Sequence, residues 1–264
     1  MLRWSKAWVV ARKDLSEFRR NRIILGSLIA MPIIFSVLMP ITVVVPFQYR
    51  SFDPDDLQGY QFPDNVTAEE AKRIVMEQSL DYLLPMFMII PAMIPTIVAS
   101  YSFVGEKLNR SLEPLLATPL TDLELFMGKC AAVFVPSMIA TLASFVAFAA
   151  ITDIALWPSF GFPVLPNLKW AFIITVVAPL LCILSIEANV YISSRVRDVR
   201  AAEQLGALVV MPLLLLVILF SVGAIQLSPL LLPALAGFLV LLDGALFFIA
   251  TKTFQRERIL TEWK

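Results

Sequence analysis

The sequence contains no histidine and only two cysteines, and these absences exclude several classes of function. Without histidine, the chain has no imidazole for acid–base catalysis, metal binding or a pH switch near neutrality. Cys130 and Cys182 both lie in apolar stretches and form neither a CxxC metal motif nor a disulfide framework. Charged residues make up only 16% of the chain, and their formal sum of zero gives no indication of nucleic-acid binding.

The chain also lacks the motifs of common ATP-binding and hydrolytic sites. Gly128-Lys129 is followed by Cys130, and position 123 is leucine, so the phosphate-binding motif G-x-x-x-x-G-K-[ST] is not met. Neither H-E-x-x-H nor G-x-S-x-G occurs. We therefore predict that the chain is not an enzyme and holds no cofactor, so that any ATP and Mg²⁺ it depends on are bound by a separate subunit.

Hydrophobic residues are abundant: they make up 59% of the chain, and its mean hydropathy is +0.80. Soluble domains are nearer half apolar, and a helix needs about 20 apolar residues to cross a hydrocarbon core of ~30 Å. The fold class is therefore an all-α integral membrane protein with one transmembrane domain over residues 23–250. We predict six transmembrane helices, at approximately 23–47, 82–104, 130–152, 170–194, 205–225 and 230–250.

The last two spans are separated on the basis of length. Residues 204–242 carry no charge, and a single helix of that length would extend ~58 Å, about twice the ~30 Å of the hydrocarbon core. The chain must fold back, and the sequence SVGAIQLSP at 221–229 is the only break signal. A charged tail, 251–264, follows the sixth span.

Two further helices are expected outside the spans. Residues 1–22 carry seven basic residues, and apolar residues recur there at helical spacing: Trp4, Trp8, Ala11, Leu15 and Phe18. This pattern predicts an amphipathic helix at the membrane interface; the alternative is a solvated lead-in to the first span. Thr67 and Glu70 form a capping-box pair, which predicts a helix over Ala68–Leu80 leading into the second span.

Basic residues are distributed unevenly between the two sides of this layout. Six spans put both termini on one side, and that side carries 17 of the 21 basic residues. Cytoplasmic loops are enriched in lysine and arginine, so both termini and the charged segments 105–129 and 195–203 are expected in the cytoplasm. We predict a multi-pass protein of the cell membrane, in contact with the lipid bilayer.

A polar segment between the second and third predicted spans, Gly105–Glu124, has a helical pattern. Leu108, Leu112, Leu115 and Leu116 recur at i, i+4, i+7 and i+8, which places them on one face of a helix. Charged residues take the remaining surface: Glu106, Lys107, Arg110 and Glu113. Thr121 with Glu124 is a capping box that opens the next helix. We predict a short amphipathic helix that is cytoplasmic.

The same segment resembles the E-K-E-N-G-T-L-E-x-L-L-A-T-P…G-K stretch of type-2 ABC transporter permeases. The matching residues are Glu106-Lys107, Asn109, Leu112-Glu113, Leu115-Leu116-Ala117-Thr118-Pro119, Leu125 and Gly128-Lys129. The departures are Leu108 in place of an acid, Arg110 in place of glycine and Ser111 in place of threonine. In that family the segment is the coupling helix, which docks on the ATPase subunit.

The resemblance implies a function and a set of partners. The chain would be the permease subunit of an ATP-driven ABC exporter, would form the substrate pathway, and would pair with a second permease copy that is identical or a paralogue. ATP and Mg²⁺ would be bound by the partner ATPase. The residues implied in ATPase coupling are Glu106, Lys107, Leu108, Arg110, Leu112, Glu113, Leu115 and Leu116.

Three polar residues fall inside predicted spans: Glu187, Asn189 and Asp243. An ionisable residue at membrane depth is costly, and is therefore a candidate for function. The two acids are either paired groups that fix helix packing or groups that contact a substrate or an ion. An alternative to the exporter is a secondary transporter or channel driven by an ion gradient, which would use Glu187 and Asp243 and need no ATPase.

Overall fold

The computed structural model describes residues 3–49, 68–108, 120–196, 198–209 and 231–253, together with four positions between 211 and 219. Throughout these residues the regular secondary structure is helical, and no strand forms. The predicted all-α class is confirmed for this part of the chain. Burial of the backbone polar groups within helices is what a membrane interior requires.

The helices follow the chain in the order predicted from the hydropathy pattern, with α1 and α3 outside the longest apolar runs. Their bounds are α1 Trp4–Phe18, α2 Arg22–Tyr49, α3 Ala68–Asp81, α4 Leu84–Phe87, α5 Ile89–Leu108, α7 Asp122–Phe160, α8 Leu168–Phe172, a π-helical turn Ile173–Val177, α9 Ala178–Arg195, α10 Val199–Gly206, a 3₁₀ turn Ala207–Val209 and α12 Leu231–Thr253. The helix predicted over Ala68–Leu80 is confirmed as α3.

Five stretches of the described residues are long and apolar enough to cross a membrane. They are Arg22–Thr42, Arg73–Leu108, Asp122–Phe160, Leu168–Arg195 and Leu231–Thr253, and they contain or overlap five of the six predicted spans. The remaining predicted span, 205–225, falls mostly outside the described residues, as does the tail from residue 254. The six-span count and the location of both termini therefore stay predictions.

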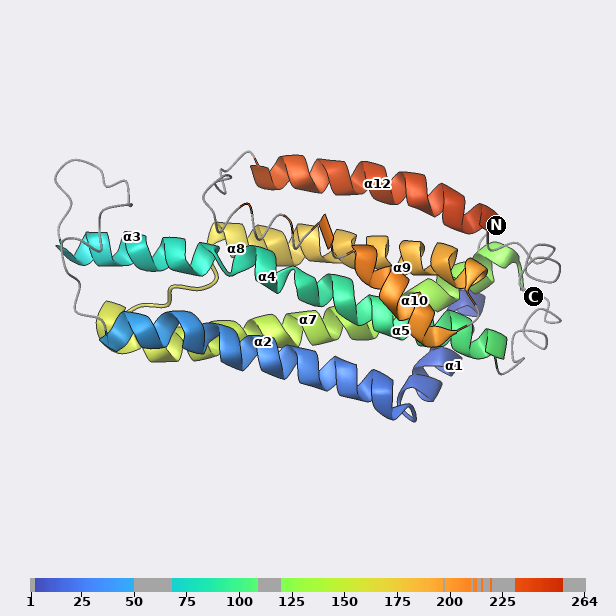
Figure 1. Ribbon diagram of the computed structural model, residues 1–264, viewed down its shortest axis with the longest axis horizontal. Coiled ribbons are helices and arrows are strands. Elements are labelled where there is room, and N and C mark those ends of the chain that lie inside the picture. Colours follow the sequence, from blue (N-terminus) through green and yellow to red (C-terminus); the bar gives the residue numbers. More distant parts are fainter. Residues whose placement is uncertain are drawn as a thin grey trace.

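The long helices run side by side along the length of the molecule, and α1 lies at one end of this bundle (Figure 1). Helix α2 packs along α7, α5 packs against both α7 and α9, and α12 packs on α9. The end of α5, the start of α7 and the ends of α9 and α12 meet at the same end of the bundle as α1 (Figure 1). We call this the α1 end.

Helix α7 is longer than the predicted third span. Thr121 caps its start at Asp122: the Thr121 hydroxyl accepts the backbone N–H of Glu124, and the Glu124 side chain accepts the N–H of Thr121, so the predicted capping box is confirmed. The helix continues to Phe160 and stops at Gly161, which has a φ of 69°. The connection predicted over 153–169 is thus mostly helix, and only 161–167 is a loop.

Asp153 accounts for the position of this loop. One carboxylate oxygen of Asp153 accepts the backbone N–H groups of Val164 at 2.8 Å and Leu165 at 3.0 Å. These bonds satisfy two donors that would otherwise be unpaired and fold the connection back onto α7. Asp153, which the predicted spans leave in the connection, is therefore part of α7.

An aromatic cluster fills the core away from the α1 end. Trp170 is fully buried, and its ring centroid lies 5.0 Å from Phe148, 5.5 Å from Phe87 and 5.8 Å from Phe145. Such aromatic pairs add about 0.5–1.5 kcal/mol each beyond the burial of their area. The cluster joins α4, α7 and α8, and so fixes the start of the α8–α9 span against the α3–α5 span.

Large apolar side chains also remain exposed along several helices. Those on α2, α7 and α12 include Ile29, Ile33, Leu38, Ile139, Val146, Phe238, Leu241 and Phe248. Exposed apolar area on this scale is rare in soluble monomers and marks contact with lipid or another chain. The surface therefore agrees with the composition in indicating a membrane protein.

Candidate functional site

The predicted coupling segment starts at the last turn of α5. Glu106, Lys107 and Leu108 belong to that turn, where Glu106 is buried and Leu108 is exposed. The other predicted coupling residues lie outside the described residues: Arg110, Leu112, Glu113, Leu115 and Leu116. The leucine face predicted from their spacing therefore stays a prediction, while the base of the segment is visible in detail.

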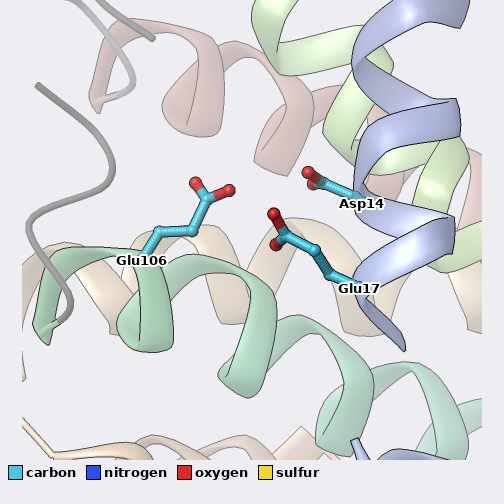
Figure 2. A group of neighbouring side chains, drawn as sticks. All are labelled: Asp14, Glu17 and Glu106. Atoms are coloured by element: carbon cyan, nitrogen blue, oxygen red, sulfur yellow. The ribbon is translucent and has the colours of Figure 1, made fainter. Parts of the chain in front are cut away.

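Glu106 lies in a cluster of charged side chains from three helices. Lys13 Nζ of α1 lies 2.7 Å from Glu106 Oε1, and Lys129 Nζ of α7 lies 2.5 Å from Glu106 Oε2. Lys129 also contacts Asp14 at 3.2 Å, and Lys13 contacts Glu17 at 3.1 Å. Figure 2 shows the carboxylates of Asp14 and Glu17 on α1 pointing toward that of Glu106 on α5. We call these five residues the charge cluster.

The three carboxylates of the charge cluster are close enough together to raise the question of a metal site. Their nearest ligand atoms all lie within 4.8 Å of one another. However, the ammonium groups of Lys13 and Lys129 already contact these carboxylates. A cation would have to displace a lysine, so the arrangement is an ion-pair network that joins α1, α5 and α7.

Lys13 remains charged within this network. Partial burial lowers the pKa of Lys13, but its hydrogen bond to Glu106 and the negative charges of Glu106 and Asp14 raise it by more. The net effect is a pKa above the usual lysine value. Lys13 is therefore an ammonium ion at neutral pH, and can hold α1 to the last turn of α5.

A close contact between α1 and α7 sets the position of the charge cluster. A Cβ atom added at Gly128 would lie 2.6 Å from the Ala7 carbonyl oxygen and 2.8 Å from Val10 Cβ, so only glycine allows this approach. The backbone N–H of Arg3 also donates to Glu124 at 3.1 Å. Within the Gly128-Lys129 pair of the resembled motif, Gly128 thus allows α1 to approach α7, and Lys129 forms an ion pair with Asp14 of α1.

The second charged segment, 195–203, also reaches the base of the coupling segment. Lys107 Nζ donates to the backbone oxygen of Val196 at 3.1 Å, just beyond the end of α9. Helix α10 follows and packs on α5 and α9. The last turn of α5 is therefore joined to α1 and α7 through Glu106, and to the end of α9 through Lys107.

The two acids at membrane depth have different surroundings from the charge cluster. Glu187 on α9 is 4% exposed and Asp243 on α12 is 8% exposed. Glu187 Oε2 and both carboxylate oxygens of Asp243 have no hydrogen-bond partner in the part of the chain that the structure describes. Arg195, the nearest base along α9, lies instead over the ring of Tyr191. Among the described residues, neither acid forms an ion pair with a base.

Asn189 has a role in packing. Its side-chain amide donates to the Ser185 carbonyl at 2.9 Å, and its side-chain oxygen accepts the Ser100 hydroxyl at 3.0 Å. A Cβ atom at Gly206 would lie 2.8 Å from that same oxygen. Asn189 therefore joins α9 to α5 beneath α10, and its polar groups are occupied within the chain.

A comparison with protein families bears on the whole helical unit. A family model described as ABC-2 family transporter protein matches residues 8–248. The chain belongs to the ABC-2 transporter family. The match extends from α1 through α12, so it includes both the charge cluster and the acids at membrane depth. Among curated proteins, none matches the chain.

Membership of the ABC-2 family confirms the resemblance drawn from the coupling segment. Together with five apolar helices of spanning length, it makes the chain a multi-pass membrane protein of an ABC transport system. ABC-2 permeases are transport components, and ABC systems include an ATPase.

The charge cluster of this ABC-2 chain was missed by the sequence reasoning, except for Glu106. One signal was available: Asp14 lies on the same helical stripe as Ala7, Val10, Ala11 and Phe18, all of which are buried. An acid on the apolar face of an amphipathic helix requires a buried base. Lys129, seven residues into α7, was that base.

Proposed function

We propose that the chain is the permease subunit of an ATP-driven exporter in the cell membrane, and that the segment from Glu106 to Leu116 transmits the motion of a separate ATPase. ATP and Mg²⁺ are held by that ATPase. A second permease, identical or a paralogue, completes the pathway. Membership of the ABC-2 family supports the transport role. The charge cluster is the observation that supports the coupling role of the segment.

The charge cluster supports this coupling because of where it lies. Residues 109–119 follow directly on the last turn of α5, and that turn is bound to α1 and α7 by the two ion pairs of Glu106. Buried charges that are broken apart leave unpaired groups behind, which costs several kcal/mol. A displacement of the segment therefore moves three helices together instead of bending one.

In this mechanism the chain performs no covalent chemistry. Closure of two ATPases around ATP pushes on the segment, and the last turn of α5 carries α1 and the start of α7 with it. Helix α9 follows through the bond from Lys107 to the Val196 carbonyl. The pathway between the two permeases then changes from inward to outward access.

The leucine face of the segment provides the test. Leu112 and Leu115 share a helical face, and burial of one leucine against a partner is worth about 1.5–3 kcal/mol. The double change Leu112→Asp and Leu115→Asp should abolish retention of the ATPase and transport, while membrane insertion stays normal. The measurement is co-purification of the ATPase in mild detergent, with ATP hydrolysis assayed in parallel.

A matched control places the same two charges away from the leucine face of the segment. Helical spacing puts Ala117 and Thr118 more than about 100° from the centre of that face, so Ala117→Asp with Thr118→Asp should retain the ATPase. If the leucine variant binds the ATPase as the wild type does, the coupling role is wrong. Transport that continues without any ATPase would favour a gradient-driven transporter that uses Glu187 and Asp243.

A further inference from the structure

A pocket lies beside Glu187 near the α1 end of the bundle. It has a volume of about 420 Å³, within the range of roughly 300–1,000 Å³ for small-molecule sites. Its wall is aromatic and aliphatic, with contributions from α1, α7, α9 and α12: Trp4, Phe126, Ala131, Phe134, Glu187 and Phe247. It is therefore built by four helices that are far apart in the sequence.

Glu187 is the charged group of this pocket. Its side chain is almost wholly buried, yet Oε2 has no hydrogen-bond partner in the part of the chain that the structure describes. No basic residue is among the described residues that line the pocket. Among the described residues of its wall, the pocket therefore holds a carboxylate and no positive group.

The aromatic wall of the pocket also favours a positively charged ligand. Phe126 and Phe247 meet edge to face, with ring centroids 5.9 Å apart. Ring faces attract cations, and more strongly when the cation is desolvated. A buried carboxylate surrounded by such rings is complementary to a cation that is itself apolar, because a small hydrated ion would lose its water without gaining polar ligands.

The depth of the pocket indicates the route by which a ligand enters. Phe126 lies four residues from the start of α7, and Glu187 lies eight residues from the end of α9, so they lie roughly 6–12 Å from the helix ends. Trp4 at the rim is 69% exposed. This is the level at which amphipathic molecules reside in one leaflet of a bilayer.

We propose that this pocket binds lipophilic organic cations that enter from the membrane leaflet, with Glu187 as the counter-charge. The inference rests on the proposed function and names a substrate class for it. Helix α1 gives the pocket a connection to the coupling segment, because the same helix supplies Trp4 to the rim and Lys13 to Glu106. A ligand against Trp4 thus contacts the helix that is bound to the last turn of α5.

The test measures binding of tetraphenylphosphonium to the full-length permease in lipid nanodiscs without ATPase. We expect saturable binding above that of empty nanodiscs. Glu187→Gln should weaken it by roughly tenfold or more, because an ion pair in a partly buried site is lost. Tetraphenylborate has the same shape and the opposite charge, so it should show no saturable binding.

A second pair of variants tests the pocket itself. Ala131→Trp fills the pocket while leaving Glu187 in place, and should abolish binding. Ala150→Trp adds the same ring to an exposed position of α7 outside the pocket, and should bind as the wild type does. Both are compared at equal amounts of monodisperse protein, so that misfolding is not read as lost affinity.

Three outcomes would overturn the proposal: no saturable binding to the wild type, equal binding of the borate anion, or unchanged affinity in Glu187→Gln. Failure of the proposed function would look different. The leucine variant of the coupling segment would then retain the ATPase, while tetraphenylphosphonium binding, measured without ATPase, would be unaffected by that result.

Discussion

Two groups of buried acids in this chain differ in what surrounds them. In the charge cluster, Glu106 and Asp14 each contact a lysine, and the fully buried Lys129 contacts both. At membrane depth, Glu187 Oε2 and the Asp243 carboxylate have no such partner among the described residues. The two groups have the same chemistry and comparable burial, yet among the described residues only the charge cluster supplies a base to its acids.

The difference separates structure from binding. An acid paired with a buried lysine holds two helices together, and its charge is not available to a ligand. An acid that remains unpaired at membrane depth is costly, and is by default a candidate for contact with a ligand or an ion. In the proposals above, the charge cluster therefore serves force transmission, and Glu187 serves recognition.

The largest expected effect comes from breaking the paired group at Lys129. Lys129→Met removes the shared base and leaves Asp14 and Glu106 buried, which should cost about 3–5 kcal/mol of stability. Helix α1 should lose its anchor on α5 and α7. The measurement is thermal unfolding of the purified protein in detergent, read by tryptophan fluorescence.

Lys252→Met is the matched control for this change. Lys252 is exposed near the end of α12 and lies over the Phe248 ring at 4.2 Å, so its loss should cost about 1 kcal/mol or less. Equal melting temperatures for the two variants would show that the charge cluster does not hold α1.

A smaller effect is expected where α1 approaches α7. Gly128→Ala places a Cβ atom 2.6 Å from the Ala7 carbonyl oxygen, and the resulting shift of α1 should cost about 1–3 kcal/mol. Gly26→Ala on α2 meets nothing within 4 Å, and should stabilise its helix by up to about 1 kcal/mol. We expect the melting temperature to fall in Gly128→Ala and to rise in Gly26→Ala, each relative to wild type. A rise in both variants would mean that the contact at Gly128 can relax.

The sequence predicted the helices well where the signal is local. Uninterrupted apolar runs located five spans, and the capping boxes placed the starts of α3 and α7, because both signals depend on neighbouring residues. The end of α7 was harder to predict. Asp153 lies in the gap between the predicted spans 130–152 and 170–194, but it is helical and its carboxylate accepts N–H groups of the loop that follows.

The charge cluster was less predictable because its members are distant in the sequence. Lys13, Glu106 and Lys129 come from three helices, and their approach depends on Gly128 admitting α1. Spacing along a helix indicates which residues share a face, but not which face another helix covers. Glu106 was assigned to the coupling segment, and its burial beneath α1 was not foreseen.

The smallest effect on stability is expected at the unpaired acids, and it sharpens the comparison most. Glu187→Gln and Asp243→Asn keep the side-chain volume and remove a charge that has no partner among the described residues. Their stability should stay within about 1 kcal/mol of the wild type, or rise, because a desolvated charge is lost. The same change in the charge cluster, Glu106→Gln, leaves Lys13 and Lys129 to share Asp14 and should cost more, up to about 3 kcal/mol. The measurement is the melting temperature of wild type and of the three variants, with tetraphenylphosphonium and without it.

Wild type should gain stability from the cation in proportion to its occupancy, and Glu187→Gln should gain none. A Glu187→Gln protein as unstable as Glu106→Gln would instead place Glu187 in the packing of the bundle.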